Sequence, residues 1–162
     1  MKTANRVWFD VVGMPAPGGS KNAFRNPRTG RIVVVDAGGK RNKDWRAAVA
    51  AAGREAMQGR EMPAPPLMLT VLFKMPRPAA HLNSKGKLRR TSPVLPIVRP
   101  DLTKLLRSTE DALTGIAWAD DSQIAEQWVA RMYALPGDPP GARITISSIV
   151  VSRADGLAWE DE

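Results

Sequence analysis

The chain has 162 residues, a formal net charge of +8 and a sequence pI of about 10.4, with no cysteine and a single histidine, His81. This length suits one domain with one core, and the basic balance favours nucleic acid or another anionic surface as partner. The composition excludes a disulfide framework, a zinc knuckle, a thiol nucleophile and a histidine-rich metal site. No apolar run could span a bilayer and the N-terminal residues lack the apolar segment of a signal peptide, so we expect a cytoplasmic protein that does not act at a membrane.

Apolar runs separated by turn residues predict the elements of the first half of the chain. The residues before the proline- and glycine-rich turn are apolar and β-branched, which is typical of a strand. An Asn-Pro-Arg-Thr-Gly sequence between two short apolar runs predicts a hairpin loop. In chain order we expect a strand over 6–14, a turn over 15–20, a hairpin of 23–25 with 32–35, and an alanine-rich helix over 41–58 that begins near Asn42 and ends at Gly59.

The second half repeats the alternation of strand and helix around a long basic loop. Five prolines and no apolar period mark residues 76–100, and a loop of this length is usually functional or disordered. The expected elements are a buried strand over 67–75, a helix over 102–115, and strands over 123–133 and 143–151. We therefore predict a mixed α/β or α+β fold with one mixed sheet and two main helices, in a single domain over 1–153 followed by an acidic, flexible tail over 154–162.

Charge is distributed unevenly along the chain. Residues 21–46 hold eight basic and two acidic residues, and residues 74–107 hold nine basic residues and one acidic residue. Residues 108–138 reverse this balance, with six acidic residues and the single basic Arg131. Basic zones that flank an acidic centre suit a metal-dependent nuclease, which needs cations for phosphate and carboxylates for a metal. The alternative is a solvated surface with uneven charge.

Aspartates at the two ends of the predicted second helix are the candidate catalytic residues. Asp101 follows Pro100 at the helix start, while Asp120 and Asp121 fall in the turn after the helix. Mg²⁺ needs only one or two carboxylates besides water and phosphate oxygens, so we expect the helix to bring Asp101 and Asp121 together at a metal, with Asp120 beside them. Arg107 would stabilise charge on the phosphate. The alternatives are a helix cap for Asp101, a turn for the Asp-Asp pair, and an Arg107–Asp111 ion pair.

Basic side chains in three places are candidates for contacts with nucleic acid. Each could also be an ordinary exposed residue of a turn, a loop or a helix. We expect Trp118 to anchor the core rather than stack on a base. The candidate phosphate-binding residues are Lys21, Arg25, Lys85, Lys87, Arg89, Arg90 and Lys104.

The order of these motifs resembles the RusA-type Holliday junction resolvases of bacteria and their phages. The likeness is most specific over residues 99–124 and extends loosely over most of the chain. The segments that carry it read Asp101-Leu102-Thr103-Lys104-Leu105-Leu106-Arg107, Asp111-Ala112-Leu113-Thr114-Gly115 and Trp118-Ala119-Asp120-Asp121-Ser122-Gln123-Ile124.

This resemblance implies a homodimer that needs Mg²⁺, with Mn²⁺ as an alternative ion, and nicks four-way DNA junctions symmetrically. It implies that Asp101 and Asp121 are metal ligands and that Arg107 aids catalysis. The family has a further aspartate where this chain has Thr103. Two other functions therefore remain open: a protein that binds branched DNA without cutting it, and an RNA- or membrane-surface binder that uses the basic loop.

Overall fold

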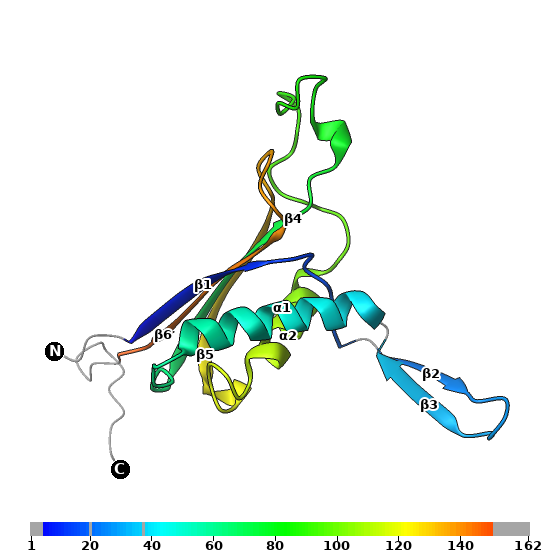
Figure 1. The fold of residues 1–162 in the computed structure, drawn as a ribbon, viewed down its shortest axis with the longest axis vertical. Coiled ribbons are helices and arrows are strands. Elements are labelled where there is room, and N and C mark those ends of the chain that lie inside the picture. Colours follow the sequence, from blue (N-terminus) through cyan, green and yellow to red (C-terminus); the bar gives the residue numbers. More distant parts are fainter. Residues whose placement is uncertain (1–4, 20, 37, 151–162) are drawn as a thin grey trace, which may run out of the picture.

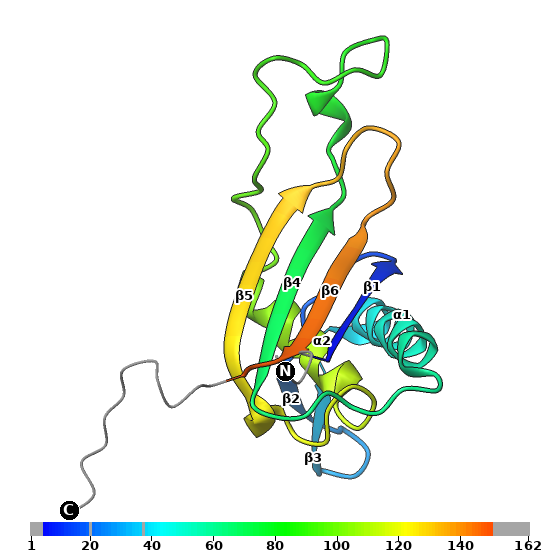
Figure 2. The same cartoon turned by 90° about the vertical axis from the view of Figure 1, so that its left-hand side faces the viewer.

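A four-stranded mixed sheet with two helices on one face forms the body of the protein (Figures 1 and 2). The computed structural model describes residues 5–19, 21–36 and 38–150. The sheet order is β1-β6-β4-β5, in which β4 and β5 are parallel and the other neighbours are antiparallel. The elements are β1 (Arg6–Val12), β2 (Lys21–Arg25), β3 (Ile32–Asp36), α1 (Gly39–Met57), β4 (Leu67–Met75), η1 (Ala79–His81), α2 (Leu102–Leu113), η2 (Asp121–Gln123), β5 (Ile124–Tyr133) and β6 (Gly141–Ser148).

This architecture confirms the predicted mixed fold and each predicted helix and strand. The boundaries move by a few residues: β6 begins at Gly141 rather than at residue 143, and α2 ends at Leu113. A glycine or a polar residue at a strand end can still pair its backbone, so side-chain patterns place such boundaries poorly. The predicted tail over 154–162 lies outside the described residues.

The central strand β4 is buried along one face in strict alternation. Leu67, Leu69, Val71 and Phe73 are fully buried, whereas the residues between them are half-buried. A strand with period-two burial packs one face on the core. Because β4 and β5 are parallel, the chain between them must cross over the sheet, and it does so through the long loop and α2.

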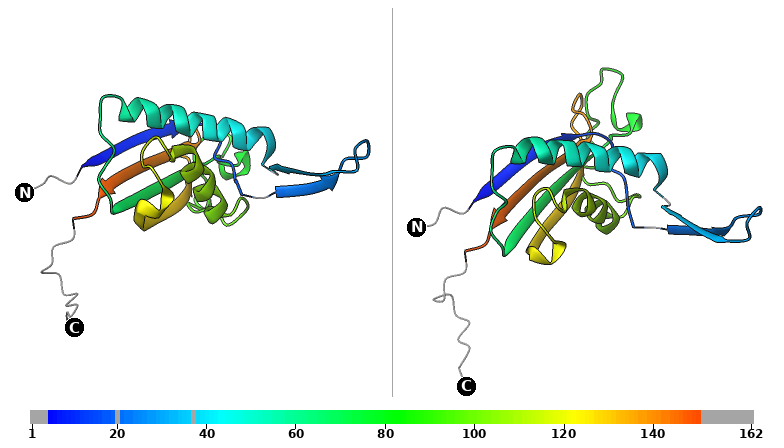
Figure 3. Two further views of the ribbon diagram at one scale, coloured as in Figure 1. Left: turned by 90° about the horizontal axis from the view of Figure 1, so that it is seen from below. Right: turned by 60° about the horizontal axis from the view of Figure 1, so that its bottom comes forward.

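Both helices pack against this buried face, α1 beside α2 (Figure 3). Trp45 of α1 lies 6.2 Å from the ring of Phe73, and its indole nitrogen donates a hydrogen bond to Thr109 Oγ1 of α2 at 3.2 Å. A second buried bond runs from Ser108 Oγ to Asn42 Oδ1 at 2.5 Å. Buried polar groups cost free energy unless they are paired, so these bonds fix the register of the two helices.

Two basic segments project from this body (Figure 1). The hairpin of β2 and β3 extends beyond the N-terminal end of α1, and the side chains of β2 are exposed. The loop over 76–100 extends from the end of β4. At its base, Arg77 donates to the Ala134 carbonyl at 2.8 Å and lies over the Tyr133 ring, which the His81 ring also contacts edge-on. The loop is therefore fixed to the sheet at its base.

Candidate active site

The carboxylate of Asp101 is exposed at the N-terminal end of α2. Asp101 occupies the N-cap position in an extended conformation, yet its side chain makes no capping hydrogen bond. Its side chain is 64% exposed, and Lys104 Nζ lies 3.7 Å from its Oδ2 atom. Asp101 therefore does not cap the helix through its side chain. Its carboxylate lies next to the Lys104 cation and the positive end of the helix dipole, and it is available to bind a ligand.

Arg131 of β5 holds the segment that leads into Asp101. Its guanidinium donates to the Val98 carbonyl at 2.8 Å and to the Pro100 carbonyl. These bonds tie the start of α2 to the sheet, so the position of Asp101 depends on the rigid part of the fold. No role for Arg131 was predicted from the sequence. The sequence contained one indication of a special role, because Arg131 is the one basic residue of the acidic stretch 108–138.

A glycine turn before β2 packs directly on α2. The Gly18 amide donates to the Lys104 carbonyl at 3.0 Å. A Cβ atom on Gly18 would lie 3.1 Å from Ser108 Cβ, and one on Gly19 would lie 2.8 Å from Arg107 Cδ. At Gly18 the neighbours include the helix backbone, with Ser108 Cα at 3.2 Å, so a larger residue there would press this turn away from α2. The close approach holds the glycine turn against the side of α2 that carries Arg107.

The Asp-Asp pair lies at the other end of α2 and is tied into the turn there. Asp121 Oδ1 accepts hydrogen bonds from Thr114 Oγ1 at 2.5 Å and from Trp118 Nε1 at 2.8 Å. Trp118 is 1% exposed, which confirms it as a core residue. Asp120 caps η2, and hydrogen bonding from Ser122 lowers the pKa of the Asp120 carboxyl. Both aspartates therefore stabilise local structure.

One chain does not bring Asp101 and Asp121 together. Thr114, which bonds Asp121, is 13 residues beyond Asp101, and a helix rises 1.5 Å per residue, so the two carboxylates lie about 20 Å apart. Within the described residues, no group of three or more His, Asp or Glu side chains could hold a metal. The expected shared site thus becomes two separate carboxylate positions, one at each end of α2.

Arg107 lies between these two positions, and its charge is not neutralised by a close partner. The alternative considered for Arg107, an ion pair with Asp111, does not form, because Asp111 instead contacts Arg46 of α1 at 3.8 Å. No acidic group of the described chain lies within 4 Å of the Arg107 guanidinium. The side chain is therefore free to contact a phosphate.

A sequence model described as Endodeoxyribonuclease RusA matches residues 16–147, which include both ends of α2. The chain belongs to the RusA endodeoxyribonuclease family. It is also similar to an uncharacterised protein, YqaN of Bacillus subtilis (strain 168), with 29% identity over 132 residues that make up 79% of this chain and 88% of that protein. In the described part of the chain, no helix has the length and apolar character needed to cross a membrane.

Glu110 is a further acidic residue of this RusA-family chain, and no role for it was predicted from the sequence. It lies on the same face of α2 as Arg107 and accepts a hydrogen bond from Gln127 of β5. Burial raises the pKa of Glu110, and the nearby charge of Asp121 raises it further. The sequence contained one indication of this position. Glu110 is three residues after Arg107 and four before Thr114, and such spacings place side chains on the same face of a helix.

The predicted nucleic-acid contacts of the RusA-family domain fall into two groups. Lys21 and Arg25 lie on the hairpin, and Lys104 lies on α2 near its base. Lys85, Lys87, Arg89 and Arg90 lie on the long loop, where Asn83 Oδ1 accepts from the amides of residues 85 and 87. Figure 1 shows that the hairpin and the loop point in different directions, so these residues do not form one patch.

Proposed function

We propose that this protein is a Mg²⁺-dependent endonuclease that resolves four-way DNA junctions by symmetric nicking, with its reaction centre at the start of α2. The observation that carries the proposal is the exposed, uncapped carboxylate of Asp101, which lies beside Lys104 and two turns before Arg107 in a RusA-family chain. A carboxylate next to cations on a basic protein suits a metal held against a phosphate backbone.

The residues at this end of α2 fit a magnesium ion that is shared with the substrate. Mg²⁺ keeps several waters and takes one or two carboxylates together with phosphate oxygens, so Asp101 alone can supply the minimum that the protein must provide. A bound Mg²⁺ would act as a Lewis acid toward the phosphate. This assignment gives Asp101 the role of metal ligand and leaves Asp121, with Asp120 beside it, as a second candidate position.

The remaining side chains would bind and orient the DNA. Arg107 would donate to the phosphate in which charge develops, as cations do in phosphoryl transfer. Lys21 and Lys104 would hold the neighbouring phosphates, and the exposed amides at the start of α2 favour negative charge. Arg131 would act indirectly, because it fixes the segment before Asp101.

Symmetric nicking requires two copies of this site. A four-way junction has approximate two-fold symmetry, and a two-fold dimer presents one site to each of the two cut strands. We therefore propose that the active form is a homodimer that acts on DNA in the cytoplasm of a bacterial or phage-infected cell.

A second candidate function is binding of branched DNA without cleavage. It is favoured by the exposed Thr103, which stands where the family has an aspartate and therefore offers no second carboxylate two residues after Asp101. Such a protein would keep the phosphate contacts and lack a competent metal site. In that case, changing Thr103→Asp should create Mg²⁺-dependent cleavage.

Substitutions at the two ends of α2 test which carboxylate serves the metal. Asp101→Asn should reduce junction cleavage by about 100-fold or more while leaving binding intact or tighter, because it removes negative charge near phosphate. Asp121→Asn keeps an oxygen that can accept from Thr114 and Trp118, so a loss of cleavage in that variant would show a metal role beyond the structural one.

Asp138→Asn, in the loop between β5 and β6, is the matched control and should cut at the wild-type rate. Cleavage and junction affinity are measured on the same labelled substrate. Wild-type cleavage by Asp101→Asn would refute the proposed centre.

A further inference from the structure

A pocket lies at the base of the long loop, beyond the ends of two neighbouring strands. β4 ends at Met75 and β5 ends at Tyr133, and these two residues are partners in the parallel register. Figure 2 shows both strands ending at the edge of the sheet from which the loop rises. Ligands of open α/β sheets commonly bind outside the carboxyl ends of parallel strands, so this edge is a favourable place for a site.

The walls of this pocket are mostly apolar. Its volume of about 140 Å³ is smaller than the about 300–1,000 Å³ of sites that enclose a whole small molecule, so it suits a single ring system. Tyr133 and Met75 are buried at the strand ends, whereas Val98 is 59% exposed. The apolar residues that line it are Met75, Pro76, Pro78, Pro96, Val98 and Tyr133.

Two guanidinium groups complete the lining. Arg99 is exposed, and its guanidinium has no hydrogen-bond or ion-pair partner within the described chain. Arg131 uses its Nη1 atom for the carbonyls of Val98 and Pro100, which leaves its Nε and Nη2 atoms for another acceptor. No acidic residue is among the described residues that line the pocket. The pocket therefore offers hydrogen-bond donors on an otherwise apolar surface.

Contacts across the base of the loop hold the walls of the pocket in place. The Tyr133 amide donates to the Val94 carbonyl at 2.9 Å, and Arg77 Nη1 donates to the Pro93 carbonyl at 3.1 Å. The Tyr133 ring is contacted by the Arg77 guanidinium at 5.1 Å and by the His81 ring at 5.0 Å. Because these contacts lie within the chain, a ligand that enters the pocket requires little further ordering.

We propose that this pocket binds one unpaired nucleobase of a branched DNA, extruded beside the reaction centre. The apolar walls stack on the flat faces of the ring, and the free guanidinium nitrogens donate to acceptor atoms on its edge. Arg99 lies two residues before Asp101, so their Cα atoms are no more than about 8 Å apart. A nucleotide whose phosphate lies near Asp101, or its neighbour, can therefore place its base in the pocket.

Capture of a base would favour a branched substrate over a linear duplex. Extruding a base costs the free energy of its stacking and pairing, and this cost is lowest for a base that is already unpaired. Stacking is interrupted where the strands of a junction cross. The pocket would therefore act as a specificity determinant, because it rewards binding at the branch point more than binding along a continuous helix.

A phosphate group suits the pocket less well than a base does. Arg99 and Arg131 would attract it, but the apolar walls would leave most of its oxygens without donors, and an incompletely bonded charge is costly to bury. A base has apolar faces and a polar edge. These match the apolar walls and the guanidinium groups of the same pocket.

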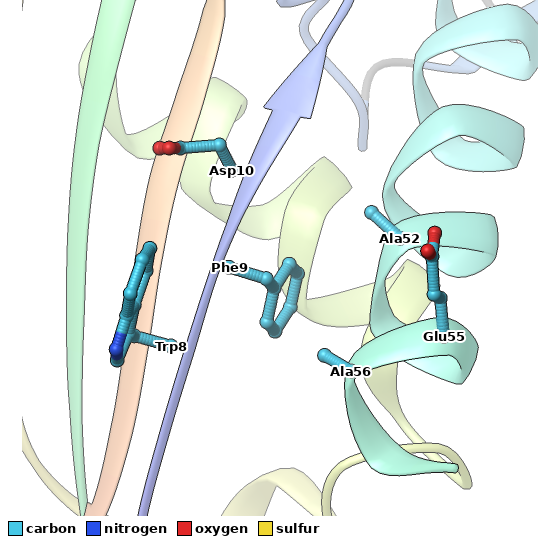
Figure 4. A pocket seen from close by; sticks show the side chains of 6 residues that line it. All are labelled: Trp8, Phe9, Asp10, Ala52, Glu55 and Ala56. Carbon is cyan, nitrogen blue, oxygen red and sulfur yellow. The ribbon is translucent and has the colours of Figure 1, made fainter.

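A hollow between β1 and α1 lacks these features (Figure 4). Phe9 points toward α1, whereas Trp8 and Asp10 point away from it. The hollow is lined by two carboxylates, those of Asp10 and Glu55, which repel the phosphates of a nucleic acid. The assignment of a nucleobase is therefore made for the pocket at the base of the loop.

This inference rests on the proposed function only in that the chain binds branched DNA. Affinities are measured in Ca²⁺, which we do not expect to support cleavage. Failure to cleave in Mg²⁺ would refute the proposed nuclease and not the pocket, whereas binding that is independent of the base would refute the pocket and not the nuclease. A chain that binds no junction would refute both.

Filling the pocket tests the inference directly. Val98→Trp adds an indole to the wall and should weaken binding of an intact four-way junction by about tenfold or more. Ile97→Trp is the matched control, because Ile97 is 94% exposed and does not line the pocket, and it should bind like the wild type. Both variants should keep the wild-type melting temperature, since both positions are exposed.

Junctions with an abasic site show whether the loss of affinity depends on a base. Each substrate lacks one base on each of two symmetry-related strands, at successive positions beside the crossover. At one position, Val98→Trp and the wild type should bind equally, because no base is left to enter the pocket. The proposal would be overturned if Val98→Trp bound the intact junction like the wild type, or if its defect were the same on every abasic substrate.

Arg99→Ala separates a base contact from a phosphate contact. It should weaken binding by about tenfold without changing the slope of log affinity against log salt, because a base contact releases no counterions. Arg90→Ala, at a candidate phosphate contact of the same loop, should make this slope shallower by about one unit. An equally shallow slope for Arg99→Ala would make Arg99 a phosphate contact and would contradict the proposed base site.

Discussion

At the scale of single residues, the availability of Asp101 is what distinguishes the start of α2 from an ordinary helix end. An aspartate at an N-cap normally accepts from the first backbone amides of the helix. Asp101 does not, and its one close partner is Lys104. Asp121 differs, because Thr114 and Trp118 occupy one of its oxygens. The aspartate at the start of the helix can therefore bind a ligand directly, whereas the one beyond its end is already held by hydrogen bonds.

Glu110 gives a pH-dependent prediction at this scale. Burial and the charge of Asp121 raise its pKa above the ordinary value, so ionised Glu110 destabilises the folded state, and this cost disappears as the pH falls through the raised pKa. Glu110→Gln keeps an oxygen for Gln127 and removes the charge. It should raise the melting temperature at pH 7 but not at pH values below about 4.

Thermal unfolding of Glu110→Gln over this pH range checks the prediction. Glu61→Gln, an exposed substitution between α1 and β4, is the control and should have no effect at either pH. A lower melting temperature for Glu110→Gln at pH 7 would mean that the carboxylate makes a favourable contact that outweighs its burial.

At the scale of elements, α1 packs tightly on α2 at Gly53. A Cβ atom there would lie 2.6 Å from Cδ2 of Leu113, which is fully buried. Alanine is favoured over glycine in a helix interior by about 1 kcal/mol. Overpacking a dense core costs about 1–3 kcal/mol, so Gly53→Ala should lower the free energy of unfolding despite the better helix propensity.

Urea unfolding of Gly53→Ala and of Ala47→Gly separates these two effects. Ala47 is exposed on the same helix, so Ala47→Gly should show the propensity term alone, a loss of about 1 kcal/mol. If Gly53→Ala were more stable than the wild type, the two helices would not be as closely packed as described.

The long basic loop makes a separate prediction about DNA binding. Lys85, Lys87 and Arg90 are exposed, whereas Arg89 donates to the Leu82 carbonyl at 2.9 Å and helps to shape the loop. Changing the first three to alanine should weaken junction binding at every sequence. The logarithm of the binding constant falls linearly with the logarithm of the salt concentration. The variant should make this slope shallower by about one unit for each phosphate that these side chains neutralise in the wild-type complex.

Equilibrium binding at several salt concentrations measures this slope. The matched control is the removal of three exposed charges from α1, namely Lys40→Ala, Lys43→Ala and Arg54→Ala. An equal loss of affinity in both triple variants would show that the loop contributes only net charge and no specific phosphate contacts.

The elements themselves could be predicted because each leaves a local pattern. The alternation of β4 and the leucine stripe of α2 depend on which face is buried, and that is visible in the order of residues. Strand partners leave no such pattern. The parallel pairing of β4 with β5 therefore appears only in the structure.

The candidate site was less predictable for the same reason. Asp101 and Asp121 are close in sequence, but the rigid helix between them holds them apart. Arg131 and Gln127 act on α2 from a strand that follows it, through contacts that no spacing rule describes. Position along one helix could be inferred from the sequence, whereas contacts between elements could not.

At the scale of the whole molecule, the two faces of the sheet differ in what they contact. One face packs on the helices and holds the start of α2 through Arg131. The other face carries the exposed side chains of Trp8 and Trp128. The two sites of the proposed homodimer would be related by a two-fold axis, which matches the symmetry of a four-way junction.

Cleavage of a labelled synthetic four-way junction, with a linear duplex of the same sequence as control, is the most direct test of this account. We expect paired symmetric nicks in the junction with Mg²⁺ or Mn²⁺, none with Ca²⁺, and no cutting of the duplex, because the proposed reaction uses a catalytic divalent ion and a two-fold substrate. Tight binding of the junction without cleavage in any of these ions would contradict it and would support the non-cleaving function, with Thr103 as the residue to change first.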